Sequence, residues 1–291
     1  MIQVKLILMA GLWAGGFIAG KMVTSQAGPF TIAFFRFLIA LLILVFLVNR
    51  YEKDFRFDVR VFVLCVGLAF LGLFCYNFFF LEGLRFISAG RGAFIVSTVP
   101  IVVALVSAVV FKERLTWAKT GGILISVIGA CIVISNGHLV TMIRQPLGRG
   151  ELYFILSVFC LTGFTLLSKH LLKTQRILVL KAYTVTAGTI LFAIPAVWEW
   201  CRSPLQVYGP DFMGNVLYLA VGPSIIAAFF YYEALHTVGT ARATQYMNLI
   251  PIFSVCFAVL FLGEAISHAL VVGGGFVTAG LYLTNWDFGS R

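Results

Sequence analysis

The chain has 291 residues, of which 61% are hydrophobic and 11% charged, and its mean hydropathy is +1.02. A soluble domain of this size has no core large enough to hide so much apolar surface, so the composition excludes a soluble globular protein and indicates a membrane protein. The formal net charge of +10 lies mainly in short links between apolar runs, where lipid headgroups and membrane topology explain it, and nucleic-acid binding is not expected.

Apolar segments follow one another along almost the whole chain. A bilayer core about 30 Å thick is crossed by about 20 apolar residues in a helix. By that measure the segments predicted to span the membrane are residues 4–23, 29–48, 60–79, 88–110, 118–136, 151–168, 177–198, 214–233, 240–262 and 268–286. We therefore predict an all-α membrane protein with ten transmembrane helices.

Basic residues in the links predict the orientation. With the N-terminus in the cytoplasm, the cytoplasmic side receives Lys5, Arg50, Lys53, Arg56, Arg60, Lys112, Arg114, Lys119, Lys169, Lys173, Arg176 and Arg291. The other side receives Arg85, Arg144, Arg149 and Arg202. Because positive charge favours the cytoplasmic side, both termini are predicted to be cytoplasmic.

The two halves of the chain share a spaced pattern of residues. Glu82, Arg91, Pro100, Glu113, Gly122 and Gly129 recur 151 positions later as Glu233, Arg242, Pro251, Glu264, Gly273 and Gly280. This indicates an internal duplication, with a first repeat at 1–137, a linker at 138–150, a second repeat at 151–286 and a tail at 287–291. Each half holds five segments, an odd number, so the second copy enters the membrane from the opposite face. Inverted repeats are typical of secondary transporters whose site lies between the halves, near the midplane.

Several stretches carry a resemblance to a known family: "LWAGGFIAGK" at 12–21, "FFRFLIA" at 34–40, "FKERLTWAKTGGILISVIGA" at 111–130 and "FLGEAISHALVVGGGFVTAG" at 261–280. The chain resembles the EamA-type members of the drug/metabolite transporter superfamily. The resemblance implies a ten-helix carrier in the inner membrane of a bacterium, with a central cavity between its halves, that often exports amino acids or related amphipathic compounds. In one place the second half departs from the pattern: "LKAYTV" at 180–185 stands where an Arg-Phe pair is expected, so Arg36 has no symmetric partner.

Charged residues near or within the spans are functional candidates because charge is costly in lipid. Glu82 with Arg91, and Glu233 with Arg242, flank two tight helical turns. Each pair is predicted to meet and fix the register of its hairpin, with a mobile gate as the alternative. Arg36 lies within the second segment. Its side chain is predicted either to reach the lipid headgroups or pair with another residue, or to contact an anionic group of the substrate.

Prolines and polar residues mark the predicted substrate site. Pro100 and Pro251, near the middle of the fourth and ninth segments, are predicted hinges because proline bends a helix and frees a carbonyl. The predicted substrate contacts beside them are Ser97, Thr98, Gln245 and Asn248. Ser and Thr often bond back to their own helix, so Gln245 and Asn248 carry more weight. The resemblance adds residues on helices that border the cavity: Trp13, Tyr76, Asn77, Tyr183, Tyr231 and Tyr246.

Glycines in the fifth and tenth segments, among them Gly122, Gly129, Gly273 and Gly280, lie at spacings that permit close helix contact. Those two segments are predicted to be scaffold or the surface of a homodimer. The six cysteines form no CxxC pair, and no metal or other cofactor is expected.

No Asp or Glu lies in the middle of a predicted span, which favours a facilitator or exchanger over a proton-coupled carrier, unless coupling runs through Glu82 or Glu233. The sequence carries no G-x-S-x-G or H-E-x-x-H motif, so an intramembrane enzyme is not expected. The predicted function is therefore a secondary transporter of small metabolites, and the resemblance implies that it is an exporter. Two alternatives remain: flipping of a lipid or lipid-linked sugar, and a non-transporting receptor or assembly protein.

Overall fold

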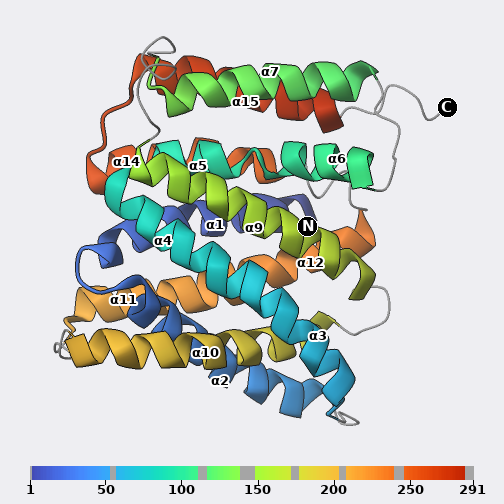
Figure 1. Cartoon of the computed structure of the whole chain (residues 1–291), viewed down its shortest axis with the longest axis vertical. Helices are drawn as coiled ribbons and strands as arrows, with labels where there is room; N and C mark the ends of the chain where they lie inside the picture. The colour runs from blue at the N-terminus through green and yellow to red at the C-terminus, as the bar shows by residue number, and fades with distance from the viewer. Residues whose placement is uncertain are drawn as a thin grey trace.

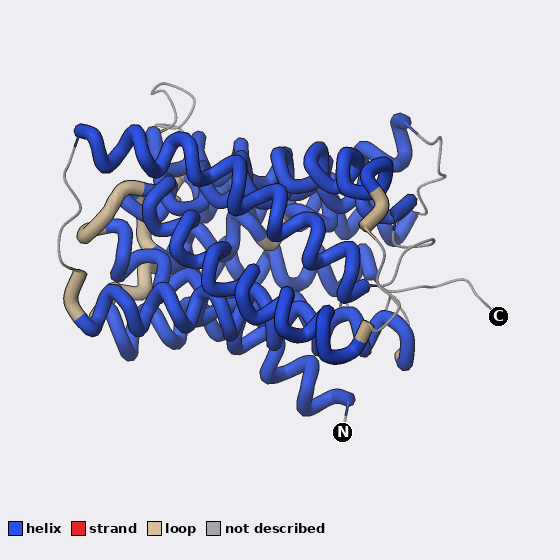
Figure 2. Tube along the Cα trace, turned by 90° about the horizontal axis from the view of Figure 1, so that it is seen from below, coloured by secondary structure: helices blue, strands red, loops and turns tan. Residues whose placement is uncertain are grey.

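The computed structural model describes residues 2–52, 57–110, 117–137, 148–171, 177–202, 208–238 and 246–285. Within these ranges every regular element is a helix (Figure 2). The first half contains α1 (Ile2–Thr24), α2 (Pro29–Tyr51), α3 (Val59–Ala69), η1 (Phe70–Cys75), α4 (Tyr76–Phe86), α5 (Ala89–Val96), α6 (Val99–Val110) and α7 (Trp117–Ile134). The second half contains α9 (Arg149–Leu171), α10 (Ile177–Arg202), α11 (Pro210–Val221), η2 (Gly222–Ala227), α12 (Ala228–Thr237), η3 (Tyr246–Asn248), α14 (Leu249–Leu262) and α15 (His268–Asn285).

The helices are long and apolar enough for a membrane protein. Six stretches meet the length and hydropathy of a membrane span: Ile2–Thr24, Pro29–Tyr51, Val59–Phe86, Arg149–Ser168, Ile177–Arg202 and Pro210–Ala234. Shorter apolar helices cover Ala89–Val103, Thr120–Ile134, Tyr246–Leu262 and His268–Leu283. Large apolar side chains such as Ile194 and Leu260 are three-quarters exposed, as expected where lipid is the solvent. The prediction of an all-helical membrane protein is confirmed.

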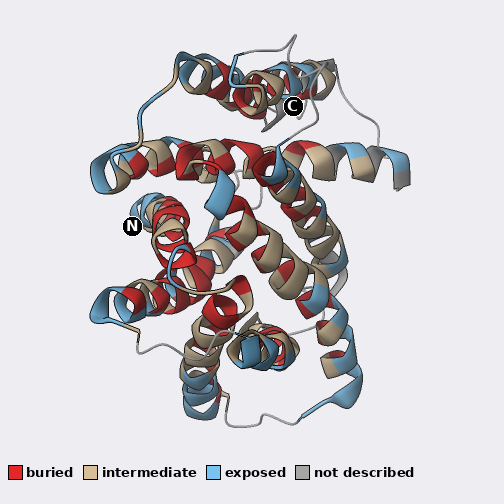
Figure 3. Ribbon diagram, turned by 60° about the vertical axis from the view of Figure 1, so that its left-hand side comes forward, coloured by how far each residue is buried: buried red, intermediate tan, exposed pale blue. Residues whose placement is uncertain are grey.

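The helices lie side by side in layers (Figure 1). At one end of the long axis α7 packs along α15, and at the other α2 packs along α10. Between these pairs lie α1, α4, α9, α11, α12 and α14, and the main cluster of buried side chains is built largely from α1, α2, α4, α10 and α11. Figure 3 shows buried residues concentrated on the faces that these helices turn toward one another. We call the face at which α1 begins the N-terminal face, and the face at which α2 begins the opposite face.

Local sequence signals set several helix ends. Pro29 starts α2 at a position where its missing N–H costs nothing. Asp58 caps α3 by accepting from the amides of Arg60 and Val61, and Ser88 caps α5 by accepting from the amide of Arg91. Gly263, with φ at 64°, ends α14 in the left-handed conformation that favours glycine. The ends of these helices therefore follow from short-range chemistry.

Two glycines allow α7 and α15 to touch backbone to backbone. A Cβ atom on Gly129 would lie 2.6 Å from the Gly273 carbonyl oxygen, and one on Gly273 would lie 2.8 Å from the Gly129 carbonyl oxygen. Beside them Ser126 Oγ donates to the Val277 carbonyl oxygen at 3.1 Å. The close contact predicted from glycine spacing is confirmed, and it is made within one chain.

Irregular turns interrupt helices in both halves. The predicted fourth span is broken at Ser97 and Thr98, between α5 and α6, just before Pro100. The 3₁₀ turn η3 precedes α14 and Pro251 in the same way. In addition, the third and eighth predicted spans each contain a π-helical turn, η1 and η2, which the sequence analysis did not predict. π-turns interrupt the regular helical ladder and occur often at functional sites.

Candidate substrate site

Arg36 connects the two halves of the chain inside the helix bundle. It lies seven residues into α2, about 10 Å from the start of the helix at 1.5 Å per residue. Its Nε donates to Ser224 Oγ at 3.0 Å, and its Nη1 donates to Asn77 Oδ1 at 3.0 Å. Ser224 belongs to η2, and Asn77 lies in the first turn of α4, two residues after the end of η1. One guanidinium group therefore holds both π-turns.

The position of Ser224 follows from the proline beside it. Pro223 has no N–H, so it cannot donate to the Leu219 carbonyl oxygen four residues earlier. The hydroxyl of Ser224 donates to that oxygen instead, at 2.9 Å. Because its proton is used there, the Ser224 oxygen presents its lone pairs to Arg36.

Asn77 is oriented in a similar way. Its Nδ2 donates to the Leu73 carbonyl oxygen of η1 at 2.8 Å, so Oδ1 points to Arg36. The residue is only 3% exposed, and its amide is well suited to a buried polar centre because both ends are bonded. In η2 the Pro223 carbonyl oxygen accepts from Trp13 Nε1 at 3.1 Å. Side-chain N–H groups thus donate to carbonyl oxygens in both π-turns.

A second cation, Lys181 of α10, lies near this centre. It lines a small cavity of about 50 Å³ together with residues that include Leu73, Thr184 and Tyr232. Its ammonium group lies 6.0 Å from the ring centroid of Tyr232, within range of a cation–π interaction. Lys181 lies on α10, which packs along α2, the helix that carries Arg36.

Within the described ranges no carboxylate pairs with Arg36 or Lys181. The acidic residues there are Glu52, Asp58, Glu82, Glu151, Glu199, Asp211, Glu233 and Glu264, each within about one turn of a helix end. The centre of the bundle therefore carries positive charge that the described side chains do not neutralise.

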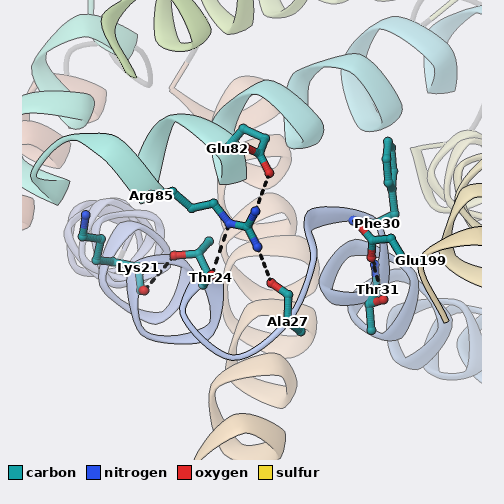
Figure 4. A network of polar contacts seen from close by, with 8 residues as sticks. All are labelled: Lys21, Thr24, Ala27, Phe30, Thr31, Glu82, Arg85 and Glu199. Carbon is teal, nitrogen blue, oxygen red and sulfur yellow. Dashed lines mark hydrogen bonds and ion pairs between the residues drawn. The ribbon is translucent and has the colours of Figure 1, made fainter. Parts of the chain in front are cut away.

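The predicted pairing of Glu82 with Arg91 is wrong. Glu82 pairs with Arg85, three residues along α4, at 2.9 Å. Arg85 also donates to the carbonyl oxygens of Thr24 and Ala27, so it ties α4 to the turn that follows α1 (Figure 4). Residues three positions apart lie on the same face of a helix, so Glu82 pairs with Arg85 rather than with Arg91 across the turn.

Arg91 instead joins three other elements. Its Nη1 lies 2.8 Å from Glu151 Oε1 in the first turn of α9. Its Nε donates to the Val133 carbonyl oxygen at 2.9 Å, and its Nη2 donates to that of Ile134. These carbonyls end α7, where a cation is favoured by the helix dipole. Arg91 thus fixes the junction of α5, α7 and α9 on the opposite face.

Glu233, the counterpart of Glu82, pairs across the halves on the N-terminal face. Its Oε1 and Oε2 accept from Lys5 Nζ at 2.6 Å and 2.8 Å. The predicted partner Arg242 and the predicted substrate contact Gln245 lie outside the described residues.

On the opposite face a glutamate joins the halves. Glu199, near the end of α10, accepts from the amide and hydroxyl of Thr31 at 2.8 Å and 2.7 Å and from the Phe30 amide at 3.3 Å, so it caps α2 (Figure 4). Glu264 acts similarly by accepting from the Ala89 amide, at 2.9 Å, at the start of α5. Sequence reasoning gave neither contact, because both partners are distant in the chain.

The other predicted substrate residues fall into separate places. Trp13 and Tyr231 have ring centroids 5.5 Å apart, and Tyr246 packs against the same cluster. Tyr76 lies beside Arg36. The carboxamide of Asn248 makes no hydrogen bond to any residue that the structure describes.

Three predicted contacts are engaged elsewhere. Ser97 and Thr98 donate back to the carbonyl oxygens of Phe94 and Ile95, at 2.7 Å each. The hydroxyl of Tyr183 accepts from the Asp58 amide at 2.8 Å, at the start of α3. The structure therefore gathers Arg36, Asn77, Tyr76 and Trp13 around the π-turns and directs these three hydroxyls to backbone groups.

Sequence reasoning missed Pro223 and Ser224 as site residues. Their signal was present, because a proline followed by a hydroxyl residue lies inside the eighth apolar segment.

A larger groove of about 650 Å³ lies between α5, α14 and α15, and its lining residues, among them Phe94, Val255 and Tyr282, include no charged side chain.

Comparison with known proteins shows the class of protein to which the chain is similar. The chain is 30% identical over 279 residues to an uncharacterized transporter of Archaeoglobus fulgidus, covering 94% of this chain and 93% of that one. It is 26% identical to an S-adenosylmethionine/S-adenosylhomocysteine transporter of Chlamydia muridarum, covering 96% and 89%. A solved crystal structure with 19% identity has the same fold, with a TM-score of 0.68 and coverage of 97% and 96%.

The fold, the buried polar centre and these relatives define an integral membrane transport protein for small molecules. More particularly, the model of the EamA-like transporter family matches the chain twice, at residues 1–135 and 148–286. The chain belongs to this family.

Proposed function

We propose that this protein is a secondary transporter that exports small metabolites, such as amino acids or related amphipathic compounds, by alternating access. The observation that carries the proposal is the position of Arg36, which contacts the π-turn regions of both halves at once. A polar centre held by both halves is where a carrier needs its substrate, since movement of one half against the other then changes the side from which the centre is reached.

Two inverted five-helix repeats, at 1–137 and 151–286, provide these moving halves. Corresponding irregularities support the duplication: η1 has its counterpart in η2, and the break at Ser97 has its counterpart at Asn248, 151 positions later. The contact of Gly129 with Gly273 has its counterpart in the contact of Gly280 with Gly122, the equivalent positions of the two halves, and this supports a symmetry axis between them. Pro100 and Pro251, next to the interrupted helices, are the proposed hinges.

Contacts between the halves provide the proposed gates. On the N-terminal face the ion pair of Lys5 and Glu233 joins α1 to α12. On the opposite face Arg91 with Glu151 joins α5 to α9, and Glu199 joins α10 to α2. Alternating access requires that contacts on the two faces break in turn.

The chemistry around the centre fits an amphipathic metabolite. Trp13, Tyr76 and Tyr231 offer aromatic surface, and the free carboxamide of Asn248 offers donors and an acceptor. The Chlamydia muridarum relative is named for S-adenosylmethionine and S-adenosylhomocysteine, both of which contain an amino-acid group. A substrate with an amino-acid group and an apolar or aromatic side chain therefore agrees with both observations.

The protein is proposed to act as a facilitator or exchanger in the inner membrane of a bacterium, with both termini in the cytoplasm. The carboxylates in the described ranges lie near helix ends, outside the centre where a proton-coupled carrier usually holds its titrating group. Transport is expected to continue when the pH gradient is collapsed, and strict dependence on that gradient would contradict this part of the proposal.

A lipid flippase is the second candidate, favoured by the lateral groove between α5, α14 and α15. A flippase has to carry a polar headgroup across the bilayer, and the residues lining this groove are almost wholly apolar. The polar centre at Arg36 thus supports a metabolite more strongly than a lipid.

A counterflow screen in liposomes tests the proposal. Purified protein is reconstituted, and exchange of labelled amino acids, nucleosides and vitamins is measured with and without a pH gradient. We expect exchange of at least one amino-acid-like solute, with a changed rate or preference in Asn248→Ala and Gln245→Ala. The control Asn215→Ala should leave both unchanged, because this partly exposed residue of α11 donates only to the Asp211 carbonyl oxygen of its own helix. Protein that moves no solute under any gradient would favour a receptor or assembly role.

A further inference from the structure

Two cations that pair with no carboxylate in the described part of the chain, Arg36 and Lys181, lie on α2 and α10, which pack against each other. Arg36 has five N–H donors and uses two of them on Asn77 and Ser224 within the described part of the chain. Lys181 has three N–H donors, and none of them meets an acceptor among the described residues. Positive charge in this environment is costly unless an anion accompanies it.

We propose that Arg36 and Lys181 together bind an anionic group of the transported molecule, a carboxylate or a group of similar charge such as a phosphate. This inference rests on the proposed transport function and specifies the substrate class. The planar guanidinium suits two-point binding of such a group, whereas the ammonium adds a charge that can approach from another direction.

Leu73 links the two cations structurally. Its carbonyl oxygen accepts from Asn77, the ligand of Arg36, and its side chain lines the cavity that contains Lys181. Movement of η1 therefore affects both cations together. The anion would replace the neutral oxygen atoms of Asn77 and Ser224 as the acceptor for Arg36, which releases both π-turns.

The size of the cavity indicates a closed state. The cavity beside Lys181 has a volume of about 50 Å³, whereas small ligand pockets have volumes of about 300 Å³ or more. A metabolite can therefore enter only when the surrounding side chains separate. Release of the π-turns by the anion provides this separation, because the π-turns are held to Arg36 in the structure. Tyr232, under the ammonium group, then provides an aromatic wall beside the charge.

Other roles for Lys181 fit the structure less well. A structural ion pair needs a carboxylate, and within the described ranges Glu233, the acidic residue of the neighbouring helix α12, pairs with Lys5 instead. A lysine that only anchors at the headgroups would place its ammonium outside the bundle, whereas this one lies over Tyr232 and lines the cavity. Recognition of an anion accounts for both positions.

Matched acid and amide pairs test the inference in proteoliposomes. Exchange of the labelled amino acid found in the counterflow screen is inhibited with L-tryptophan or L-tryptophanamide, and with L-leucine or L-leucinamide. The amides keep the ammonium and the side chain but lose the carboxylate, so we expect each amide to inhibit at least tenfold more weakly than its acid.

Three variants assign this preference to the two cations. Lys181→Met is expected to reduce the preference for the acid at least threefold, and Lys181→Arg to retain it because the charge remains. Arg36→Gln is expected to abolish exchange or the preference. The control Arg60→Met removes an exposed cation at the start of α3, outside the site and the proposed gates, and should keep the wild-type preference. Size-exclusion profiles and unfolding temperatures confirm that each variant is folded.

Two results would overturn the inference while leaving transport intact: equal inhibition by acid and amide in the wild type, or an unchanged preference in folded Lys181→Met. Absence of any exchange in the wild type has a different meaning, since it removes the proposed transport function itself and this inference with it.

Discussion

Arg36 and Ser224 are 188 residues apart in the chain, yet Nε of one lies 3.0 Å from Oγ of the other. The contact joins α2 of the first half to the π-turn η2 of the second. It exists because Pro223 leaves the Leu219 carbonyl oxygen without its usual amide donor, which the Ser224 hydroxyl replaces. A backbone irregularity thus prepares the acceptor for a buried cation.

Replacing Pro223 with alanine should therefore remove the irregularity. The new N–H can donate to the Leu219 carbonyl oxygen, so η2 is expected to become regular α-helix and Ser224 to turn away from Arg36. Stability should stay equal or rise, since a helix-interior proline costs about 3 kcal/mol in an isolated helix, whereas transport should fall at least fivefold. Unfolding temperature and counterflow rate measure the two effects.

Pro195 provides the matched control, because it also lies inside a helix, α10, but outside the π-turns. Pro195→Ala should keep the counterflow rate of the wild type. Equal losses of transport in both proline variants would show that helix bending in general, and not the contact of Ser224 with Arg36, is what matters.

The glycine contact of α7 and α15 predicts a large difference between neighbouring positions. Gly273→Val places new atoms against the Gly129 carbonyl, and overpacking of this kind costs about 1–3 kcal/mol or more where backbone has to move. A Cβ atom on Gly275 would meet no atom within 4 Å, and valine has a higher helix propensity than glycine, so Gly275→Val should leave the stability equal or slightly raised. Thermal unfolding in detergent compares the two variants, and similar unfolding temperatures would contradict the close contact of α7 with α15 at Gly273.

The ion pair of Arg91 and Glu151 predicts coupled stability effects. Glu151 is 7% exposed, so Glu151→Gln leaves the partly buried guanidinium without its anion. We expect the free energy of unfolding to fall by somewhat less than the about 3–5 kcal/mol lost when a fully buried pair is broken, because Arg91 still donates to the carbonyl oxygens that end α7. Glu82→Gln, which removes a partly exposed pair within one helix, should cost less, because Arg85 is 35% exposed and water can solvate its charge. A double-mutant cycle of Arg91→Gln with Glu151→Gln that shows no coupling would refute the pairing.

The exposed pair of Lys5 and Glu233 predicts an effect on transport without one on stability. Their side chains are 32% and 46% exposed, and pairs of this kind contribute about 0–1 kcal/mol. Glu233→Gln should therefore unfold at nearly the wild-type temperature, yet change the exchange rate at least threefold if the pair closes the N-terminal face. Exchanging the two charges, Lys5→Glu with Glu233→Lys, should restore the rate, and an unaltered rate in both variants argues against a gate here.

Features that depend on neighbouring residues were predictable from the sequence. The apolar segments, the start of α2 at Pro29 and the interruptions next to Pro100 and Pro251 follow from hydropathy and from the missing N–H of proline. Close helix contact at the glycines of α7 and α15 also followed, because small residues at regular spacing mark one face of a helix, whereas the packing decided that the two helices contact each other. The partners of Glu82 and Arg91 did not follow from the sequence, although the recurrence of these two residues 151 positions later was correct as a pattern.

Apolar length, spacing and duplication are properties of a line of residues, and they determined that this chain is a helical membrane protein of two similar halves. Which charge meets which was decided only when the helices packed. A long side chain on one helix can reach several neighbouring helices. Arg91 pairs with Glu151 because α5, α7 and α9 meet at one place. Arg36 bonds Asn77 and Ser224 because α2 packs beside the two π-turns. The energy of a buried charge depends on all groups around it in space, and that environment exists only in the folded bundle.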